Sequence, residues 1–105
     1  MGPGKAELIS HIEATGSISA AARQMNMSYR RAWLLVEAIN DSFVEPVVLT
    51  AIGGKRGGGT QVTPFGQQLV VQFRAMEDKA SAAIADDIAR YTQKLRRPAA
   101  KRKSR

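Results

Sequence analysis

The stretch 16–40, GSISAAARQMNMSYRRAWLLVEAIN, constrains the fold of this chain more than any other part of its sequence. It is typical of two short helices joined by a tight turn. We expect Ser19 and Ser28 to cap these helices, because a serine hydroxyl accepts hydrogen bonds from backbone N–H groups that the first helical turn leaves unpaired. Asn26 suits the turn between them, since its side chain can bond the nearby backbone. A helix, a short turn and a second helix form the helix-turn-helix outline.

The second helix of this unit has one apolar stripe and a basic, aromatic beginning. Apolar residues at positions 32, 36 and 39 recur at helical spacing, which predicts that this side is buried. Trp33 is the only tryptophan, and we expect it to be a core or interface anchor more readily than a base contact. In helix-turn-helix proteins the N-terminal part of the second helix reaches base edges in the DNA major groove.

A first helix is expected over residues 5–15, after a frayed start at 1–4. Its apolar side carries Ala6, Leu8, Ile9 and Ile12, and Gly16 follows as a left-handed C-terminal cap. Ile18 is positioned to pack between helices. After the two-helix unit, residues 41–46 form a connector, which we expect Phe43 and Val44 to anchor to the core.

Two short strands are predicted next, at 47–52 and 60–63, around the glycine-rich segment GGKRGGG at 53–59. A β-hairpin after a helix-turn-helix forms the wing of a winged helix. Glycine allows the backbone to come close to a phosphate chain, and Lys55 and Arg56 supply two adjacent cations. A flexible surface hairpin is the alternative. A phosphate-binding loop is a weaker interpretation, because the sequence lacks the Gly-Lys-Ser/Thr spacing and no following helix starts at the right place.

Thr63-Pro64 is a strong helix start, and a helical pattern continues from there to Arg97, before Pro98. A helix of this length, roughly 50 Å at about 1.5 Å per residue, exceeds the width of so small a domain. We therefore expect a second copy of the chain to cover its apolar stripe. A break near Ala82 that folds the C-terminal half back is the alternative. The residues expected at the dimer interface are Leu69, Phe73, Met76, Ala80, Ile84, Ile88, Tyr91 and Leu95.

The net charge of +7 comes from the end of the chain. Residues 94–105 contain seven basic side chains and no acidic one, so the nine basic and nine acidic residues before them balance. Such a tail either binds polyanions without sequence preference or is only solvated. No apolar run reaches the roughly 18 residues of a membrane span, and no signal peptide is evident. We expect a cytoplasmic bacterial protein.

The residue types argue against catalysis and against cofactors or metals. There is no cysteine, and His11 is the only histidine, expected to be a partly exposed helix residue. The carboxylate pairs Glu77-Asp78 and Asp86-Asp87 are sequence neighbours, which point to different sides of a helix. No serine has a histidine nearby in a recognisable pattern. We therefore expect a protein that is not an enzyme and holds no cofactor.

Three segments together resemble the N-terminal DNA-binding domain of the ModE family of molybdate-responsive regulators. They are GSISAAARQMNMSYRRAW, GGKRGGGTQVTPFG and the long helix that follows. The GSISAAA and TPFG pieces also resemble the winged domains of LysR-type regulators. The resemblance, over roughly residues 4–92, implies a mainly α fold with a small β-hairpin: a winged helix-turn-helix, then a long C-terminal dimerisation helix. It divides the chain into a DNA-binding domain at 1–63 (helix-turn-helix 19–40, wing 47–63), a dimerisation helix at 64–97 and a basic tail at 98–105.

The family resemblance further implies a homodimer on a palindromic operator near molybdenum-transport genes. The residues expected to contact double-stranded DNA are Ser19, Arg23, Ser28, Tyr29, Arg30, Arg31, Lys55, Arg56 and Thr60. Of Arg30 and Arg31, about 100° apart on a helix, one is expected to read a base and the other to hold phosphate. Arg23 can touch phosphate or pair with Glu37.

Full-length family members carry C-terminal molybdate-binding domains, whereas this sequence ends in a basic tail. We therefore expect the chain to respond to no ligand by itself, or to act with a separate oxyanion-binding protein. Two other functions stay open from the sequence: a nonspecific nucleoid-type DNA-binding protein, and a helical protein-interaction module that does not bind DNA.

Overall fold

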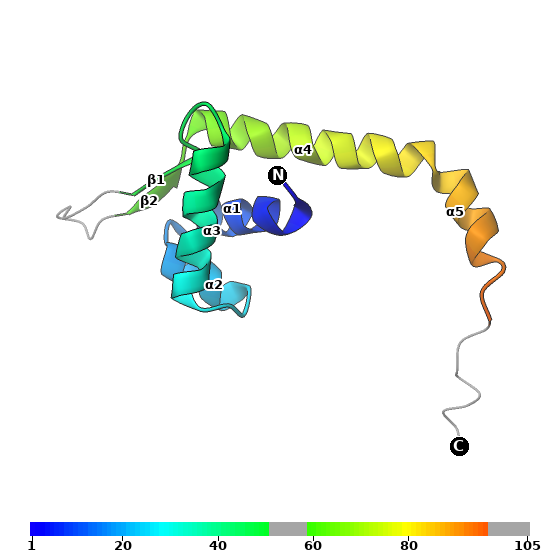
Figure 1. Ribbon diagram of the computed structural model, residues 1–105, viewed down its shortest axis with the longest axis horizontal. Helices are drawn as coiled ribbons and strands as arrows, with labels where there is room; N and C mark the ends of the chain where they lie inside the picture. Colours follow the sequence, from blue (N-terminus) through cyan, green and yellow to red (C-terminus); the bar gives the residue numbers. More distant parts are fainter. Residues whose placement is uncertain (51–58, 97–105) are drawn as a thin grey trace, which may run out of the picture. The chain divides into compact units, whose positions relative to one another are not determined.

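The structure, a computed structural model, describes residues 1–50 and 59–96. Its elements are α1 (Pro3–Thr15), α2 (Ile18–Gln24), α3 (Tyr29–Ser42), β1 (Val48–Thr50), β2 (Thr60–Val62), α4 (Pro64–Ala83) and α5 (Ala85–Thr92) (Figure 1). The predicted class, mainly α with a small β-hairpin, is confirmed. The chain divides into two compact units, Met1–Arg74 and a second that begins at Ala75.

Helix α1 begins earlier than the sequence pattern predicts, so the expected frayed start at 1–4 is wrong. Pro3 stands at the first helical position, where its missing N–H removes no hydrogen bond and its fixed φ favours the helix. The far end agrees with the prediction: Gly16 is left-handed (φ 70°), and its N–H donates to the Ile12 carbonyl over 2.7 Å. Glycine adopts this conformation without steric cost.

Helix α2 is capped by Ser17, and the prediction of Ser19 for this role is wrong. Ser17 has extended backbone, and its hydroxyl accepts from the Ala20 N–H at 3.0 Å. The chain leaves α1 at Gly16, so Ser17 is the first residue whose side chain can reach the free N–H groups of α2. Ile18 then falls in the first helical turn, where it is buried as expected.

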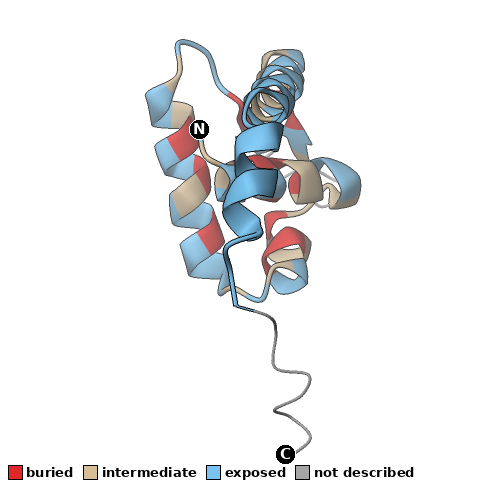
Figure 2. Cartoon of the chain, turned by 90° about the vertical axis from the view of Figure 1, so that its right-hand side faces the viewer, coloured by how far each residue is buried: buried red, intermediate tan, exposed pale blue. Residues whose placement is uncertain are grey.

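The core lies in the first unit, where α1, α2 and α3 pack together and β2 packs against α1. Figure 2 shows the buried residues gathered on the inner sides of these elements. The buried positions predicted for α1 and α3 are all confirmed. Ala21 and Ala22 are also buried, and their small side chains let the neighbouring helices approach closely. The core cluster is Leu8, Ile9, Ile12, Ile18, Ala21, Ala22, Ala32, Val36, Ile39, Val47, Val48 and Val62.

The hairpin closes one side of this core. Strands β1 and β2 are antiparallel, with Val48 opposite Val62, Leu49 opposite Gln61 and Thr50 opposite Thr60. Side chains alternate across a strand, so Val48 and Val62 share the buried face while Leu49 points outward. Both strands are shorter than predicted within the described residues.

The connector between α3 and β1 is anchored by one of the two residues expected there. Phe43 packs against the core and meets Phe65 edge-to-face, with ring centroids 6.4 Å apart. The prediction for Val44 is wrong: this side chain is 92% exposed.

The predicted start of α4 is confirmed in detail. The Thr63 hydroxyl accepts from the Gly66 N–H at 2.9 Å, and Pro64 is the first helical residue. The same hydroxyl donates to the Pro46 carbonyl at 2.8 Å, which joins the start of α4 to the entry of β1. Gly66 permits this approach, because a Cβ there would lie 2.6 Å from the Val47 carbonyl oxygen.

The single helix predicted over 64–97 is wrong. Ile84, with φ −111° and ψ 11°, interrupts it between α4 and α5, and α5 ends at Thr92. The interruption coincides with the shift in apolar spacing at 83–84, and Asp86 and Asp87 then favour a new helix N-terminus. In the described ranges, no helix has the combination of length and hydropathy that crossing a bilayer requires.

Candidate nucleic-acid interface

The turn between α2 and α3 is built around Asn26. This residue is left-handed, with φ 56°, which asparagine tolerates better than most side chains. The N–H groups of Met25 and Met27 both donate to Ala22, at 3.1 and 3.0 Å, and both methionines pack against the core. The turn thereby sets the start of α3 firmly relative to α2.

Helix α3 starts as the sequence predicts. The Ser28 hydroxyl accepts from the Arg31 N–H at 3.0 Å and so satisfies one of the free donors of the first turn. The side chains of Ser28, Tyr29, Arg30 and Arg31 are all exposed. Two cations, a phenol and a helix N-terminus therefore share one end of α3, an arrangement that favours an anion.

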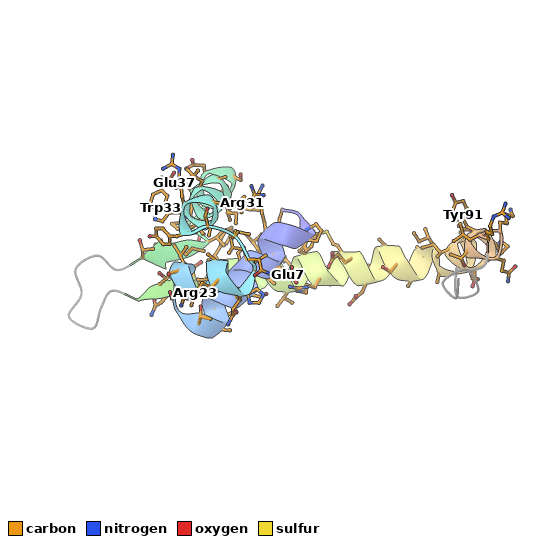
Figure 3. The ribbon with its side chains drawn as sticks, turned by 90° about the horizontal axis from the view of Figure 1, so that it is seen from below. Glu7, Arg23, Arg31, Trp33, Glu37 and Tyr91 are labelled. Carbon is orange, nitrogen blue, oxygen red and sulfur yellow. The ribbon has the colours of Figure 1, made fainter. Side chains whose placement is uncertain are left out.

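The residues of α3 fall on a buried side, on the side opposite it and on two flanks. Ala32, Val36 and Ile39 form the buried side. At about 100° per residue, Arg30 and Leu34 lie opposite that side. Figure 3 shows Trp33 and Glu37 together on one flank of α3 and Arg31 on the other. A shallow hollow of about 340 Å³ runs along the Arg31 flank and is lined by Ser28, Arg30, Arg31, Leu34 and Leu35.

Trp33 is not part of the core. It is 39% exposed on α3, so the core interpretation of this tryptophan is wrong, while an interface role agrees with its exposure. Tyr29, one helical turn before it, is 54% exposed. An exposed aromatic pair beside two arginines can contact both the bases and the backbone of a nucleic acid.

Arg23 lies on the exposed side of α2 and bonds within its own helix. Its Nη1 donates to the Ser19 hydroxyl at 3.2 Å. Pairing of Arg23 with Glu37 is not seen; in the described part of the chain, the one ion pair joins Arg90 to Asp87. Ser19 thus loses its predicted capping role and orients Arg23 instead.

Asn40 joins α3 to the hairpin, and sequence reasoning did not identify it. Its Oδ1 accepts from the N–H groups of Val47 and Val48 at 2.8 and 3.0 Å, and its Nδ2 donates to the Val48 carbonyl at 2.9 Å. The signal available in the sequence was an asparagine in the last turn of a helix, just before a connector.

The structure describes only the base of the wing, residues 47–50 and 59–63. Thr60, a predicted contact, is half-buried at the start of β2, and its N–H donates to the Gly16 carbonyl at 3.0 Å. That bond ties the hairpin to the turn between α1 and α2. Lys55 and Arg56 lie outside the described residues.

The residues predicted for dimerisation differ in their surroundings. Leu69 packs against the core of its own chain, and Phe73 is half-buried. The others are exposed, among them Met76, Ile84, Ile88, Tyr91 and Leu95 at 47–69%. Over residues 1–50 and 59–96, no group of three or more acidic or histidine side chains could hold a metal ion.

The fold is that of a winged-helix DNA-binding domain. A solved structure of the DNA-binding domain of CbnR in complex with DNA matches it with a TM-score of 0.64, covering 90% of this chain and all of that one. The two sequences are 16% identical, so this likeness concerns the fold.

Sequence relatives are closer. The molybdenum-pterin-binding protein MopB of Rhodobacter capsulatus is 47% identical over 77 residues. The molybdenum transport protein ModE of Azotobacter vinelandii is 39% identical over 77 residues. The DNA-binding transcriptional dual regulator ModE of Escherichia coli K12 is 34% identical over 88 residues. These alignments cover 73%, 73% and 81% of this chain.

The same alignments span only 28%, 28% and 34% of the relatives' own lengths. No family model matches the chain. The resemblance inferred from SYRRAW and the glycine-rich wing is nevertheless confirmed: over most of its length, this chain is a homologue of the ModE and Mop proteins.

Proposed function

We propose that this chain is the DNA-binding part of a transcription regulator of molybdenum genes, and that it acts as a homodimer on a palindromic operator. The observation that carries the proposal is the exposed start of α3, where Ser28 caps a helix bearing Tyr29, Arg30 and Arg31. In helix-turn-helix proteins this end of the second helix contacts base edges in the major groove.

The two arginines have different roles in this proposal. Arg30 lies opposite the buried side of α3, so it points to the groove floor when the helix docks, and a guanidinium there can bond guanine O6 and N7 together. Arg31 lies on a flank, where the groove wall carries phosphates. Phosphate contacts fix orientation and carry no sequence information. The remaining proposed DNA contacts are Ser19, Arg23, Ser28, Tyr29, Lys55, Arg56 and Thr60.

The link to molybdenum and to regulation is supported by the relatives. One is named a DNA-binding transcriptional dual regulator, and others a molybdenum transport protein and a molybdenum-pterin-binding protein. The fold neighbour was solved bound to DNA. A dimer is supported by the exposed apolar side chains Ile84, Ile88, Tyr91 and Leu95, which need a cover. A palindrome matches the two-fold symmetry of a dimer.

Selection of bound sequences from a random DNA pool tests this function. We expect one palindromic site to be enriched. Arg30→Ala should then relax the preference at one base pair per half-site, at a cost of about 1–3 kcal/mol. Arg31→Ala, the matched control, should weaken binding to all sequences alike. Enrichment of no site would contradict a sequence-specific regulator.

A nonspecific DNA-binding protein is the second candidate, favoured by the seven basic residues at 94–105. Deleting residues 98–105 removes four of them. If these cations sit on phosphates, the slope of log K against log salt should flatten by up to about 0.9 per lost contact. A chain whose binding depends mainly on the tail would lose nearly all affinity on deletion, whereas the proposed regulator keeps its preferred site.

A further inference from the structure

The side of α3 that faces outward carries acidic side chains as well as basic ones. Glu37 and Asp41 are both exposed. Glu37 shares a flank with Trp33 (Figure 3). Within residues 1–50 and 59–96 the one salt bridge joins Arg90 to Asp87, so Glu37 has no cationic partner among these residues. A carboxylate on a helix that approaches DNA is repelled by phosphates, so its position calls for a compensating contact.

The spacing lets Glu37 face base edges when α3 docks along the major groove as proposed above. Arg30, Leu34 and Glu37 are three and four residues apart, on neighbouring turns of the outward side. At about 1.5 Å per residue, Arg30 and Glu37 are roughly 10 Å apart along the helix, close to three base-pair steps of about 3.4 Å. When Arg30 reads one base pair, Glu37 therefore faces another one further along the groove.

We propose that Glu37 determines specificity by accepting a hydrogen bond from an exocyclic amino group in the major groove, cytosine N4 or adenine N6. The inference rests on the DNA-binding function proposed above. An ionised carboxylate only accepts hydrogen bonds. Among the major-groove edges, guanine and thymine present acceptors at the corresponding positions, and they would leave the carboxylate unpaired.

The neighbours of Glu37 sharpen this discrimination. Trp33 and Leu34, four and three residues earlier, are 39% and 49% exposed and lie next to Glu37 on the helix surface. Against DNA these apolar side chains exclude water from around the carboxylate. A buried charge without a partner costs far more than a solvated one, so a wrong base is rejected more strongly.

The test compares three forms of the full chain in selection from a random DNA pool, followed by binding to the selected duplex. Wild type should select cytosine or adenine at one position beyond that read by Arg30. In the wild type, the affinities for the selected duplex and for its variant at that position should differ by 5- to 150-fold, the ratio equivalent to about 1–3 kcal/mol. Glu37→Ala should lose this preference, so the two affinities should become similar. Asp41→Ala removes a carboxylate one turn further along and should keep the preference.

Glu37→Gln separates the two bases. Glutamine bonds adenine N6 and N7 together, so a cytosine reader should turn towards adenine, and an adenine reader should keep adenine. Circular dichroism confirms that each variant is folded. An unchanged preference in Glu37→Ala, or an equal loss in Asp41→Ala, overturns the assignment of Glu37 while the proposed function stands. Selection of no site by the wild type overturns both.

Discussion

The two units of the chain differ in how far their apolar side chains are buried. In residues 1–74, thirteen hydrophobic residues are buried. In residues 75–96, no residue is buried, although Met76, Ile84, Ile88, Tyr91 and Leu95 are large and apolar (Figure 2). Ile12 is fully buried and Ile88 is 48% exposed, so one residue type has two different environments.

This contrast indicates which part of the chain can be stable by itself. The first unit buries its apolar residues within one chain, and its helix caps and hairpin bonds satisfy the backbone around them. The second unit leaves Ile88 and Tyr91 exposed on α5, and Ile84 and Leu95 exposed just outside the two ends of that helix. Their spacings of four, three and four residues are those of a helical pattern.

The largest effect is expected from charging the stripe. Replacing both Ile84 and Ile88 with Asp should turn the proposed dimer into a monomer in sedimentation, because two carboxylates would be buried without partners at the interface. Ala89→Asp with Gln93→Asp is the matched control, on the opposite side of α5 and at its C-cap, and it should leave the dimer intact. A dimer that persists after replacement of Ile84 and Ile88 would show that the interface lies elsewhere.

The next effect compares the two isoleucines directly. Ile12→Ala should lower the free energy of unfolding by about 2–5 kcal/mol, because it removes buried methyl groups and leaves a cavity. Ile88→Ala should have little effect on unfolding at a protein concentration where the chain is monomeric. Chemical denaturation of both variants measures this difference. Equal losses would show that the two units are not distinct in stability.

A smaller effect is expected at the start of α4. Gly66→Ala should destabilise the first unit by about 1–3 kcal/mol, because the new Cβ would lie 2.6 Å from the Val47 carbonyl oxygen and 2.8 Å from its Cγ1. Gly4→Ala in α1 meets nothing within 4 Å and should be neutral or stabilising by up to about 1 kcal/mol. Thermal melting of both variants measures this difference. An unchanged melting temperature in Gly66→Ala would mean that α4 can shift against the segment around Val47.

No effect is expected from molybdate. This chain aligns with only 28% of the length of the two relatives named for molybdenum. We propose that oxyanion capture needs residues beyond that aligned part, or a separate oxyanion-binding protein. The purified 105-residue chain should bind its operator equally with and without molybdate. Calorimetry showing tight molybdate binding in excess over sulfate would contradict this prediction.

Features that depend on local chemistry were predictable from the sequence. Gly16, Asn26, Ser28 and Thr63 occupy the cap and turn positions expected of them, because each role depends on a few neighbouring backbone groups. The buried sides of α1 and α3 followed from helical spacing alone. The basic start of α3 followed from these, since a capped helix with a known buried side leaves its arginines outside.

Features that depend on competition or on distant partners were not predictable. Ser17 and Ser19 are both good caps, and the left-handed Gly16 decided between them. Val44 is apolar, but its exposure depends on where the chain turns after α3. Asn40 bonds Val47, just before β1, and Val48, the first residue of β1, which a helical pattern does not reveal. The interruption at Ile84 left only a shift in apolar spacing.

The three bonds of Asn40 have a consequence for the shape of the DNA that fits. They hold α3 and β1 together, so α3 and the strand that leads into the wing keep a fixed separation. Two binding elements at a fixed separation fit best where the two DNA surfaces that they contact are the same distance apart. In the proposed DNA complex, this fixed separation favours DNA whose groove width matches it, and groove width varies with sequence even at base pairs that no side chain touches.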